Sequence, residues 1–291
     1  MNILPILILN TLMLALGDEP NAGTNYCKLA CENPKKTHAV CANRMQKLIE
    51  NCPPDAKIMP LDDIQAVILK LHNERRDFVA SGKDERLPPA ARMGELFWDE
   101  ELADLAEYSV RRCLISDPHC YTTPTLPNPG RSANIYKFEK IEVPFEELVP
   151  SRVVEWLETS RECTAEMAAD FPENPEGHVD FFGRAITDSN NQVGCAASEW
   201  VKKSDKYFLL VCLYTNDVKP GKRLYKFGRP GSRCLTSYSE QYKNLCSIHE
   251  NYNITDAKYE RRALSVFNPI NKNAGRTDYN APEGSMWQLV I

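Results

Sequence analysis

The most informative stretch of this sequence consists of two apolar runs, Val193-Gly-Cys-Ala-Ala-Ser-Glu-Trp200 and Tyr207-Phe-Leu-Leu-Val-Cys-Leu-Tyr214. Both are rich in β-branched, aromatic and apolar residues, which is typical of buried strands. Only residues 201–206 separate them, and most of these are charged. The pattern therefore predicts a hairpin of two buried neighbouring strands. Each strand carries one cysteine, Cys195 and Cys212, and a cross-strand disulfide between them is sterically plausible.

Length and composition favour one main domain with an appendage. The chain has 291 residues, of which 43% are hydrophobic, so it can bury one substantial core. Its formal net charge of -5 gives no general electrostatic reason to expect nucleic acid or an anionic membrane as a partner. The 11 cysteines are more informative, because their chemistry depends on the compartment in which the chain folds.

The N-terminal sequence indicates export. Residues 1–17 are apolar and end in small residues, which fits a secretory signal with cleavage between Gly17 and about Gly23. A signal anchor is the alternative, but the run is shorter than the roughly 20 residues that span a bilayer. No later stretch qualifies as a membrane span. We therefore expect a secreted, extracellular protein whose cysteines form disulfides rather than metal sites.

Helical periodicity predicts three amphipathic helices. The first begins at an Asp cap in 61–63 and ends near Gly82, the second covers 99–115, and the third covers 151–167. Residues 118–129 contain four prolines and indicate an irregular loop. The apolar face of the first helix is expected to carry Ile64, Val67, Ile68, Leu71, Phe78 and Val79.

Several segments resemble a known family. Gly177-His178 ahead of an aromatic pair, Val193-Gly-Cys-Ala196 and Leu210-Val-Cys-Leu-Tyr214 are similar to signature segments of the CAP superfamily. This superfamily contains cysteine-rich secretory proteins, antigen 5 proteins and plant pathogenesis-related proteins. His72-Asn-Glu-Arg-Arg76 is similar to the family's His-Asn-x-x-Arg, and for His72 we expect a structural hydrogen bond rather than a metal ligand. Asn25-Tyr-Cys-Lys-Leu-Ala-Cys31 is similar to the mature start of arthropod antigen 5 proteins.

The resemblance implies an α+β fold, a three-layer α-β-α sandwich with a disulfide-stapled N-terminal lead and a loose C-terminal tail. Asn253-Ile-Thr255 is an N-glycosylation sequon, as expected on an exposed site of a glycoprotein. The expected organisation is a signal peptide at 1–17, a cysteine-rich lead at 25–60, the CAP domain at 61–218, a C-terminal cystine loop at 219–250 and a flexible tail at 251–291.

The resemblance also implies a disulfide pattern that spacing alone does not select. The pairs implied by the antigen 5 pattern are Cys27–Cys41, Cys31–Cys120, Cys52–Cys113 and Cys195–Cys212. Cys234 and Cys246 are expected to pair locally. This leaves Cys163 as either a free thiol in the core or an intermolecular link, so we expect a monomer unless Cys163 joins two chains. A catalytic thiol is a third interpretation, but no Cys-His-Asn arrangement is suggested around it.

Many CAP domains carry a cleft with two His and two Glu that can hold a divalent metal. The corresponding positions of this chain are His178, Asp117, Arg131 and Thr159. Because only the histidine is kept and a cation opposes a metal, we expect a vestigial cleft with no catalytic residue, metal or cofactor. A site rebuilt from His178, Asp117, His119 and Glu155 is the alternative.

These features favour a non-enzymatic binding or signalling protein of a glandular fluid, such as venom, saliva or male seminal fluid, with a possible post-mating role. Its surface loops would meet an extracellular protein, glycan or lipid. Segment 219–233 has six bases and no acid, which favours a solvated loop or attraction of a sulfated glycan or acidic protein. Two alternatives are a metal-assisted hydrolase or protease with a rebuilt cleft around His178, and a sterol or lipid carrier with an apolar groove near 118–129.

Overall fold

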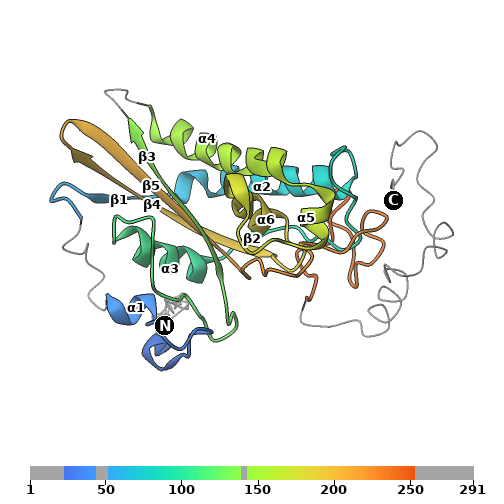
Figure 1. The fold of residues 1–291 in the computed structure, drawn as a ribbon, viewed down its shortest axis with the longest axis horizontal. Coiled ribbons are helices and arrows are strands. Elements are labelled where there is room, and N and C mark those ends of the chain that lie inside the picture. Colours follow the sequence, from blue (N-terminus) through green and yellow to red (C-terminus); the bar gives the residue numbers. More distant parts are fainter. Residues whose placement is uncertain (1–22, 44–51, 139–142, 253–291) are drawn as a thin grey trace, which may run out of the picture.

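The computed structural model of the protein describes residues 23–43, 52–138 and 143–252 (Figure 1). The expected signal peptide, the Asn253 sequon and the rest of the expected tail from 253 onward lie outside these residues. The described part of the chain is the expected α+β, three-layer α-β-α sandwich, in which one sheet lies between two layers of helices.

The hairpin predicted from the two apolar runs is confirmed. β4 (Gln192–Lys202) and β5 (Asp205–Tyr214) pair antiparallel, with Cys195 directly opposite Cys212. The turn between them places Lys203 at φ 53 and Ser204 at φ 72. Positive φ at both central residues is the requirement of a type I′ hairpin turn, whose twist matches that of the strands.

The other three strands were not predicted. β3 (Gly130–Phe138) pairs antiparallel with β5, and β1 (Lys57–Met59) pairs antiparallel with β4. β2 (Phe97–Trp98) adds to β4 in parallel. The resulting order is β1-β4-β5-β3, so the predicted hairpin forms the centre of the sheet.

Alternate residues of β5 face two different cores, which explains why the run 207–214 is apolar throughout. Phe208, Leu210 and Tyr214 pack in the core beneath α2 (Gln65–Ala80), α4 (Phe145–Glu158) and α6 (Val179–Ile186). The core on the opposite face contains Leu209, Val211 and Leu213 together with Leu102, Leu105 and Ala106 of α3 (Glu100–Val110).

The first predicted helix is present, but its start and part of its face differ. The Asp residues at 62 and 63 form a 3-10 turn, η2 (Asp62–Ile64), and α2 follows with Ile64 as its N-cap and no side-chain capping bond. The predicted Asp cap was therefore wrong. Ile64, Ile68 and Val79 are buried, whereas Val67 and Phe78 are about two-fifths exposed, because the helix buries a narrower stripe than predicted.

The second and third helices are shorter or shifted relative to the prediction. α3 is capped by Asp99, whose side chain accepts from Leu102 N, and it ends at Val110 rather than Ile115, since Cys113 has φ 53. α4 starts at Phe145, six residues before the predicted start, and contains Pro150. The predicted continuation to Met167 divides into η3 (Thr159–Glu162) and α5 (Ala165–Ala169), because Cys163 has extended backbone.

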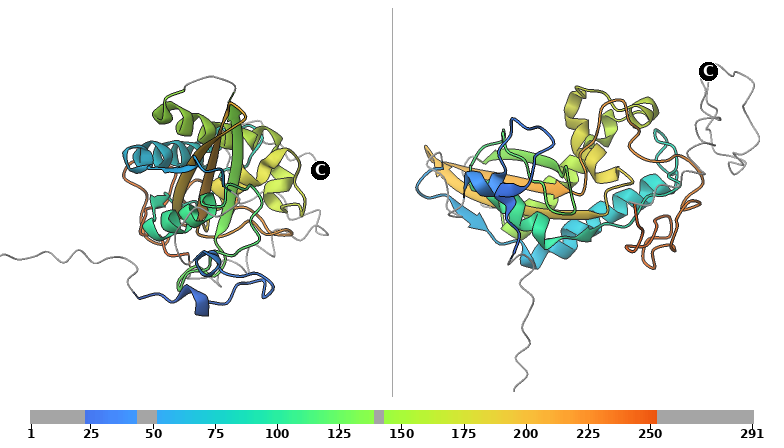
Figure 2. Two further views of the ribbon diagram at one scale, coloured as in Figure 1. Left: turned by 90° about the vertical axis from the view of Figure 1, so that its left-hand side faces the viewer. Right: turned by 90° about the horizontal axis from the view of Figure 1, so that it is seen from below.

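The described residues of the N-terminal lead contain η1 (Tyr26–Lys28), α1 (Ala39–Ala42) and β1, and α1 lies beside α3 (Figures 1 and 2). The Tyr26 hydroxyl donates to Glu101 Oε1 on α3 at 2.6 Å. His38 Nε2 is 2.8 Å from Thr122 O, and its Nδ1 accepts from Val40 N, so the imidazole joins the lead to the loop after α3.

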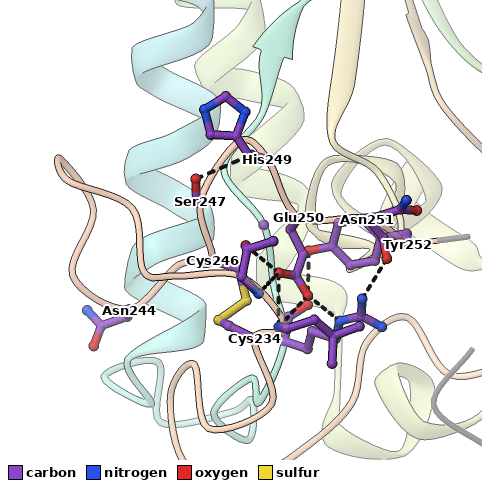
Figure 3. The surroundings of a disulfide bond; sticks show 12 residues. Cys234, Asn244, Cys246, Ser247, His249, Glu250, Asn251 and Tyr252 are labelled. Atoms are coloured by element: carbon purple, nitrogen blue, oxygen red, sulfur yellow. Dashed lines mark hydrogen bonds and ion pairs between the residues drawn. A yellow bond between two sulfur atoms is a disulfide. The ribbon is translucent and has the colours of Figure 1, made fainter. Parts of the chain in front are cut away.

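The segment 219–252 shares a third core with residues 87–93, α5 and α6. Backbone bonds join the two segments, including Lys226 O to Ala91 N and Met93 O to Cys246 N, both at 2.7 Å. Beside the Cys234–Cys246 disulfide, Glu250 accepts from the backbone N–H groups of 235 and 236 (Figure 3). Tyr252, within the expected flexible tail, donates its hydroxyl to Arg92 O. The chain is therefore anchored to the main core as far as Tyr252.

Candidate functional site

Asp117 lies in the loop after α3 and is enclosed by donors. Its side chain is 1% exposed, and Oδ1 accepts from His119 N at 3.0 Å and lies 2.5 Å from His119 Nδ1. Oδ2 accepts from the Tyr121 hydroxyl and from Ser109 Oγ. Arg112 Nε completes the surroundings at 3.5 Å from Oδ2. Asp117 is therefore engaged by neighbours on its own loop and on the end of α3.

Electrostatics agree with this enclosure. Burial alone would raise the pKa of Asp117, but the hydrogen bonds from Tyr121 and His119 and the charge of Arg131 outweigh burial and hold the pKa below its usual range. The pKa of Tyr121 is raised by burial and by the nearby Asp117 charge, so this hydroxyl stays a donor. Asp117 is accordingly a carboxylate whose charge is already compensated.

Arg131 joins the same network through Ser109. Its Nε donates to Ser109 Oγ at 2.9 Å, and its Nη1 donates to Ile115 O at 2.8 Å. The arginine stands on β3, opposite Leu213 of β5. Two of the four expected cleft residues, Asp117 and Arg131, are thus brought together around one serine.

The other two expected cleft residues lie around Trp156. His178 follows Gly177 in a left-handed turn at the start of α6, is exposed, and stacks on Phe181 with ring centroids 5.3 Å apart. Phe181 packs edge-on against Trp156 at 5.1 Å. Thr159 donates its hydroxyl to Trp156 O at 2.7 Å, as a residue at the end of a helix commonly does.

The residues of the alternative, rebuilt metal site do not all contact one another. Asp117 and His119 touch, but Glu155 lies 2.6 Å from Arg152 Nη1 and His178 stacks on an aromatic ring. Within residues 23–43, 52–138 and 143–252, no group of three or more His, Cys, Asp or Glu side chains is placed to hold a metal ion.

Three residues of the network were missed in the sequence. Ser109 lies in the last turn of α3, Arg112 lies in the turn that follows this helix, and Tyr121 follows Cys120 in the loop. The helical spacing of 109 and 112 was the only available signal. Their role depends on β3, whose pairing with β5 the sequence did not reveal.

The His-Asn-x-x-Arg segment has a structural role in this chain. His72 is 1% exposed, with Nδ1 2.8 Å from Ile68 O and Nε2 2.9 Å from the Tyr214 hydroxyl. Since a carbonyl only accepts, Nδ1 donates to Ile68 and Nε2 accepts from Tyr214. The fully buried Arg76 donates to four carbonyl oxygens, those of Gly94, Ala185, Thr187 and Asn190. The expected local hydrogen bond of His72 is present.

The disulfides of the structure are the five pairs named from the sequence: Cys27–Cys41, Cys31–Cys120, Cys52–Cys113, Cys195–Cys212 and Cys234–Cys246. Cys163 is free and 1% exposed, and burial raises its pKa to about 12. Its position below the surface agrees with the interpretation of a thiol in the core. Five disulfides are consistent with an oxidising, extracellular compartment.

Comparison with known proteins identifies the family. The model of the cysteine-rich secretory protein family, CAP, matches residues 69–214. Venom allergen-1 of Aedes albopictus is 30% identical over 231 residues, covering 78% of this chain and 88% of that protein. Tablysin 15 of Tabanus yao is 31% identical over 229 residues with the same two coverages. The chain therefore belongs to the CAP family, and its similarity to these insect proteins agrees with an arthropod antigen 5-like branch.

Solved structures show the same fold. The crystal structure of NaASP2 with Zn²⁺ has a TM-score of 0.51 at 20% identity and covers 67% of this chain and 100% of that chain. The crystal structure of Na-ASP-1 has a TM-score of 0.52 at 21% identity and covers 67% of this chain and 52% of that chain. At such identities the likeness concerns the fold alone. In the described ranges no helix combines the length and the apolar character that crossing a bilayer requires.

Proposed function

We propose that this CAP protein is a secreted, non-enzymatic binding or signalling protein of a glandular fluid, and that it acts through its surface loops. The observation that carries the proposal is the state of the cleft. Asp117, the residue at the first histidine position, is bound by Tyr121, His119 and Ser109, and Arg131 occupies the position of a family glutamate.

The charge of this cleft argues against a metal-dependent reaction. A divalent cation placed near Arg131 and Arg112 would be repelled by both guanidinium groups, and the single carboxylate between them already accepts several hydrogen bonds. Zn²⁺ generally needs three or four nitrogen, oxygen or sulfur ligands that converge on one point. His178, which stacks on Phe181, would supply one of them.

The names of relatives support the setting of the proposal. Venom allergen-1 is the name of the similar proteins from Aedes albopictus and Aedes aegypti. From these names we infer that this chain is an exported protein of venom, saliva or male seminal fluid, where it would act on a host or a mate. The five disulfides suit such a fluid, because small extracellular domains depend on them for stability.

Calorimetric titration of Zn²⁺ into the secreted, metal-stripped protein tests the non-enzymatic part. We expect no saturable binding at micromolar concentration in the wild type or in His178→Ala. Micromolar binding that disappears in His178→Ala, together with chelator-sensitive hydrolysis of a peptide or ester, would instead support a metal-assisted hydrolase.

Quantitative immunoblotting tests the setting separately. The protein is expected in venom, salivary or accessory-gland secretion and to be depleted from the remaining tissue. A seminal role further predicts its transfer to the female at mating, followed by a changed post-mating response when it is absent from the male. Equal amounts in non-glandular tissue would contradict the proposed setting without affecting the argument about the cleft.

A further inference from the structure

An open pocket of about 400 Å³ lies at the C-terminal end of α2, and its lining includes none of the four cleft residues. It is lined by Arg75 and Phe78 of α2 and by the charged loop Lys83, Asp84, Glu85 and Arg86. Its volume is within the range of about 300 to 1,000 Å³ typical of small-molecule sites. The pocket therefore has room for a compact ligand.

The carboxylate of the pocket is already saturated by its own arginines. Asp84 is buried, and its Oδ2 accepts from Arg75 Nη2 at 2.9 Å and from Arg86 Nη2 at 3.2 Å. Its Oδ1 accepts from Arg86 N at 3.1 Å and from Arg86 Nε at 3.2 Å. Asp84 thus holds both guanidinium groups in place without offering a free lone pair to a ligand.

Ser160 fixes the two arginines from the other side. Its Oγ accepts from Arg75 Nη2 at 2.6 Å, and its carbonyl accepts from Arg86 Nη1 at 2.9 Å. Each guanidinium carries five N–H donors, and these bonds use only part of them. In the described part of the chain, Arg75 Nε is buried without a partner. The two arginines therefore keep N–H groups that Asp84 and Ser160 do not occupy.

An aromatic surface adjoins these donors. The Arg75 guanidinium lies 5.2 Å from the centroid of Phe78 and 5.4 Å from that of Phe182, so two rings restrict its movement. Phe78 is 38% exposed, although the helix period placed it on the buried face. A partly exposed ring at the wall of a cationic pocket suits a ligand with an apolar portion next to an anionic group.

Two exposed residues at the edge of the pocket carry opposite charges. Lys83 and Glu85 are both exposed and both line the pocket. With the two arginines and Asp84, the lining has three cations and two carboxylates, and one of those carboxylates is neutralised in place. The pocket consequently favours an anion, and Glu85 weakens that preference.

We propose that this pocket binds a small soluble phosphate or sulfate ester, whose oxyanion accepts from Arg75, Arg86 and Lys83 while its apolar group lies on Phe78. Guanidinium forks match the oxygens of such anions in geometry and charge. The assignment goes beyond the proposed function and does not depend on the state of the cleft.

Calorimetric titration of the full secreted chain with phenyl phosphate tests the proposal, and inorganic phosphate and phenol serve as the two half-ligands. We expect phenyl phosphate to bind with a dissociation constant of about 0.1 to 1 mM, and each half-ligand at least about tenfold more weakly. Lys83→Gln is expected to weaken binding about threefold, and Glu85→Gln to strengthen it by a similar factor. Phe78→Ala should abolish the preference for phenyl phosphate over inorganic phosphate.

Lys203→Gln is the matched control, because it removes an exposed lysine at the hairpin turn and should leave the affinity unchanged. These variants alter exposed side chains, so their folding can be verified by unchanged unfolding midpoints. Absence of saturable binding, or equal weakening by Lys203→Gln and Lys83→Gln, would overturn the site. Co-sedimentation with vesicles of phosphatidylcholine and phosphatidic acid that Lys83→Gln abolishes would overturn the assignment to a soluble ester.

Discussion

Arg92 Nε lies 2.6 Å from Glu250 Oε1, and both side chains are almost completely buried. This ion pair joins the segment between α2 and β2 to the last described turn of the chain. Glu250 also accepts from the backbone of residues 235 and 236, and Arg92 lies over the ring of Tyr252 at 4.9 Å. Removal of either charge would leave the other buried and uncompensated.

The first prediction follows from this pair. We expect Glu250→Gln to lower the free energy of unfolding by about 3 to 5 kcal/mol, which is typical when one partner of a buried pair is removed. The double variant Arg92→Met/Glu250→Leu should cost less than the single change, since it leaves no buried charge. Urea unfolding of the wild type and the two variants measures this, and a loss in the double variant as large as that in Glu250→Gln would contradict the explanation.

The second prediction concerns acid sensitivity through His72. Burial lowers the pKa of His72 from 6.5 to about 4, although the bond to Ile68 opposes this. Between these pH values the unfolded chain takes up a proton that the folded chain excludes, so stability falls as pH is lowered from 6.5 to 4. The expected loss is roughly 3 kcal/mol.

Urea unfolding from pH 7 to pH 4 measures this dependence in the wild type and in His72→Gln. The variant should be less stable at pH 7 and should have a smaller slope below pH 6.5. Some slope should remain, because burial also lowers the pKa of His38. An identical slope in both proteins would show that His72 is not the group responsible.

The third prediction concerns the lead. Cys31 and Cys120 are 89 positions apart in the sequence. In the chain-entropy model a crosslink over such a distance raises the free energy of unfolding by about 4 to 5 kcal/mol. The double variant Cys31→Ser/Cys120→Ser should lose much of this stability, and its lead should be cleaved by protease before the sheet. Removing Cys27 and Cys41, which are 14 apart, should cost less.

The fourth prediction concerns Cys163. Because its thiol is buried and its pKa is raised to about 12, a maleimide reagent should label the folded protein very slowly and label it once in denaturant. The protein should migrate as a monomer on a non-reducing gel. Rapid labelling in native buffer, or a dimer lost in Cys163→Ala, would contradict a buried structural thiol.

The fifth prediction concerns the cleft. If replacement of the family ligands explains the expected lack of metal binding, the triple variant Asp117→His/Arg131→Glu/Thr159→Glu should acquire micromolar Zn²⁺ affinity that the wild type lacks. Adding His178→Ala should remove most of that affinity. Calorimetry provides the measurement, and comparable Zn²⁺ binding by wild type and triple variant would refute the explanation.

Periodicity was sufficient to locate the hairpin and the three main helices, because their buried positions repeat at a regular interval. It failed where an element is short or depends on distant pairing. β3 pairs with residues about 75 positions later in the chain, and nothing in 130–138 specifies that register. Phe78 has the period of a buried residue, yet it lies at the wall of a pocket that the loop 83–86 creates.

The cleft was predictable only in part, and from the family resemblance rather than from periodicity. The resemblance located Asp117, Arg131, Thr159 and His178, since these positions are fixed relative to recognisable motifs. It gave no indication that Ser109 would link Asp117 to Arg131, because a serine near a helix end is ordinary in sequence. The pairing that brings them together is a property of the assembled sheet and helix.

Arg76 and its four carbonyl partners have a consequence for how such a chain can diverge. The guanidinium supports the backbone around 185–190 from inside, without help from any cleft side chain. Substitutions in the cleft can then accumulate while the surrounding loops keep their conformation. The scaffold can therefore persist while the cleft residues change, and searches keyed to His-Asn-x-x-Arg would detect chains of this fold whatever residues their cleft carries.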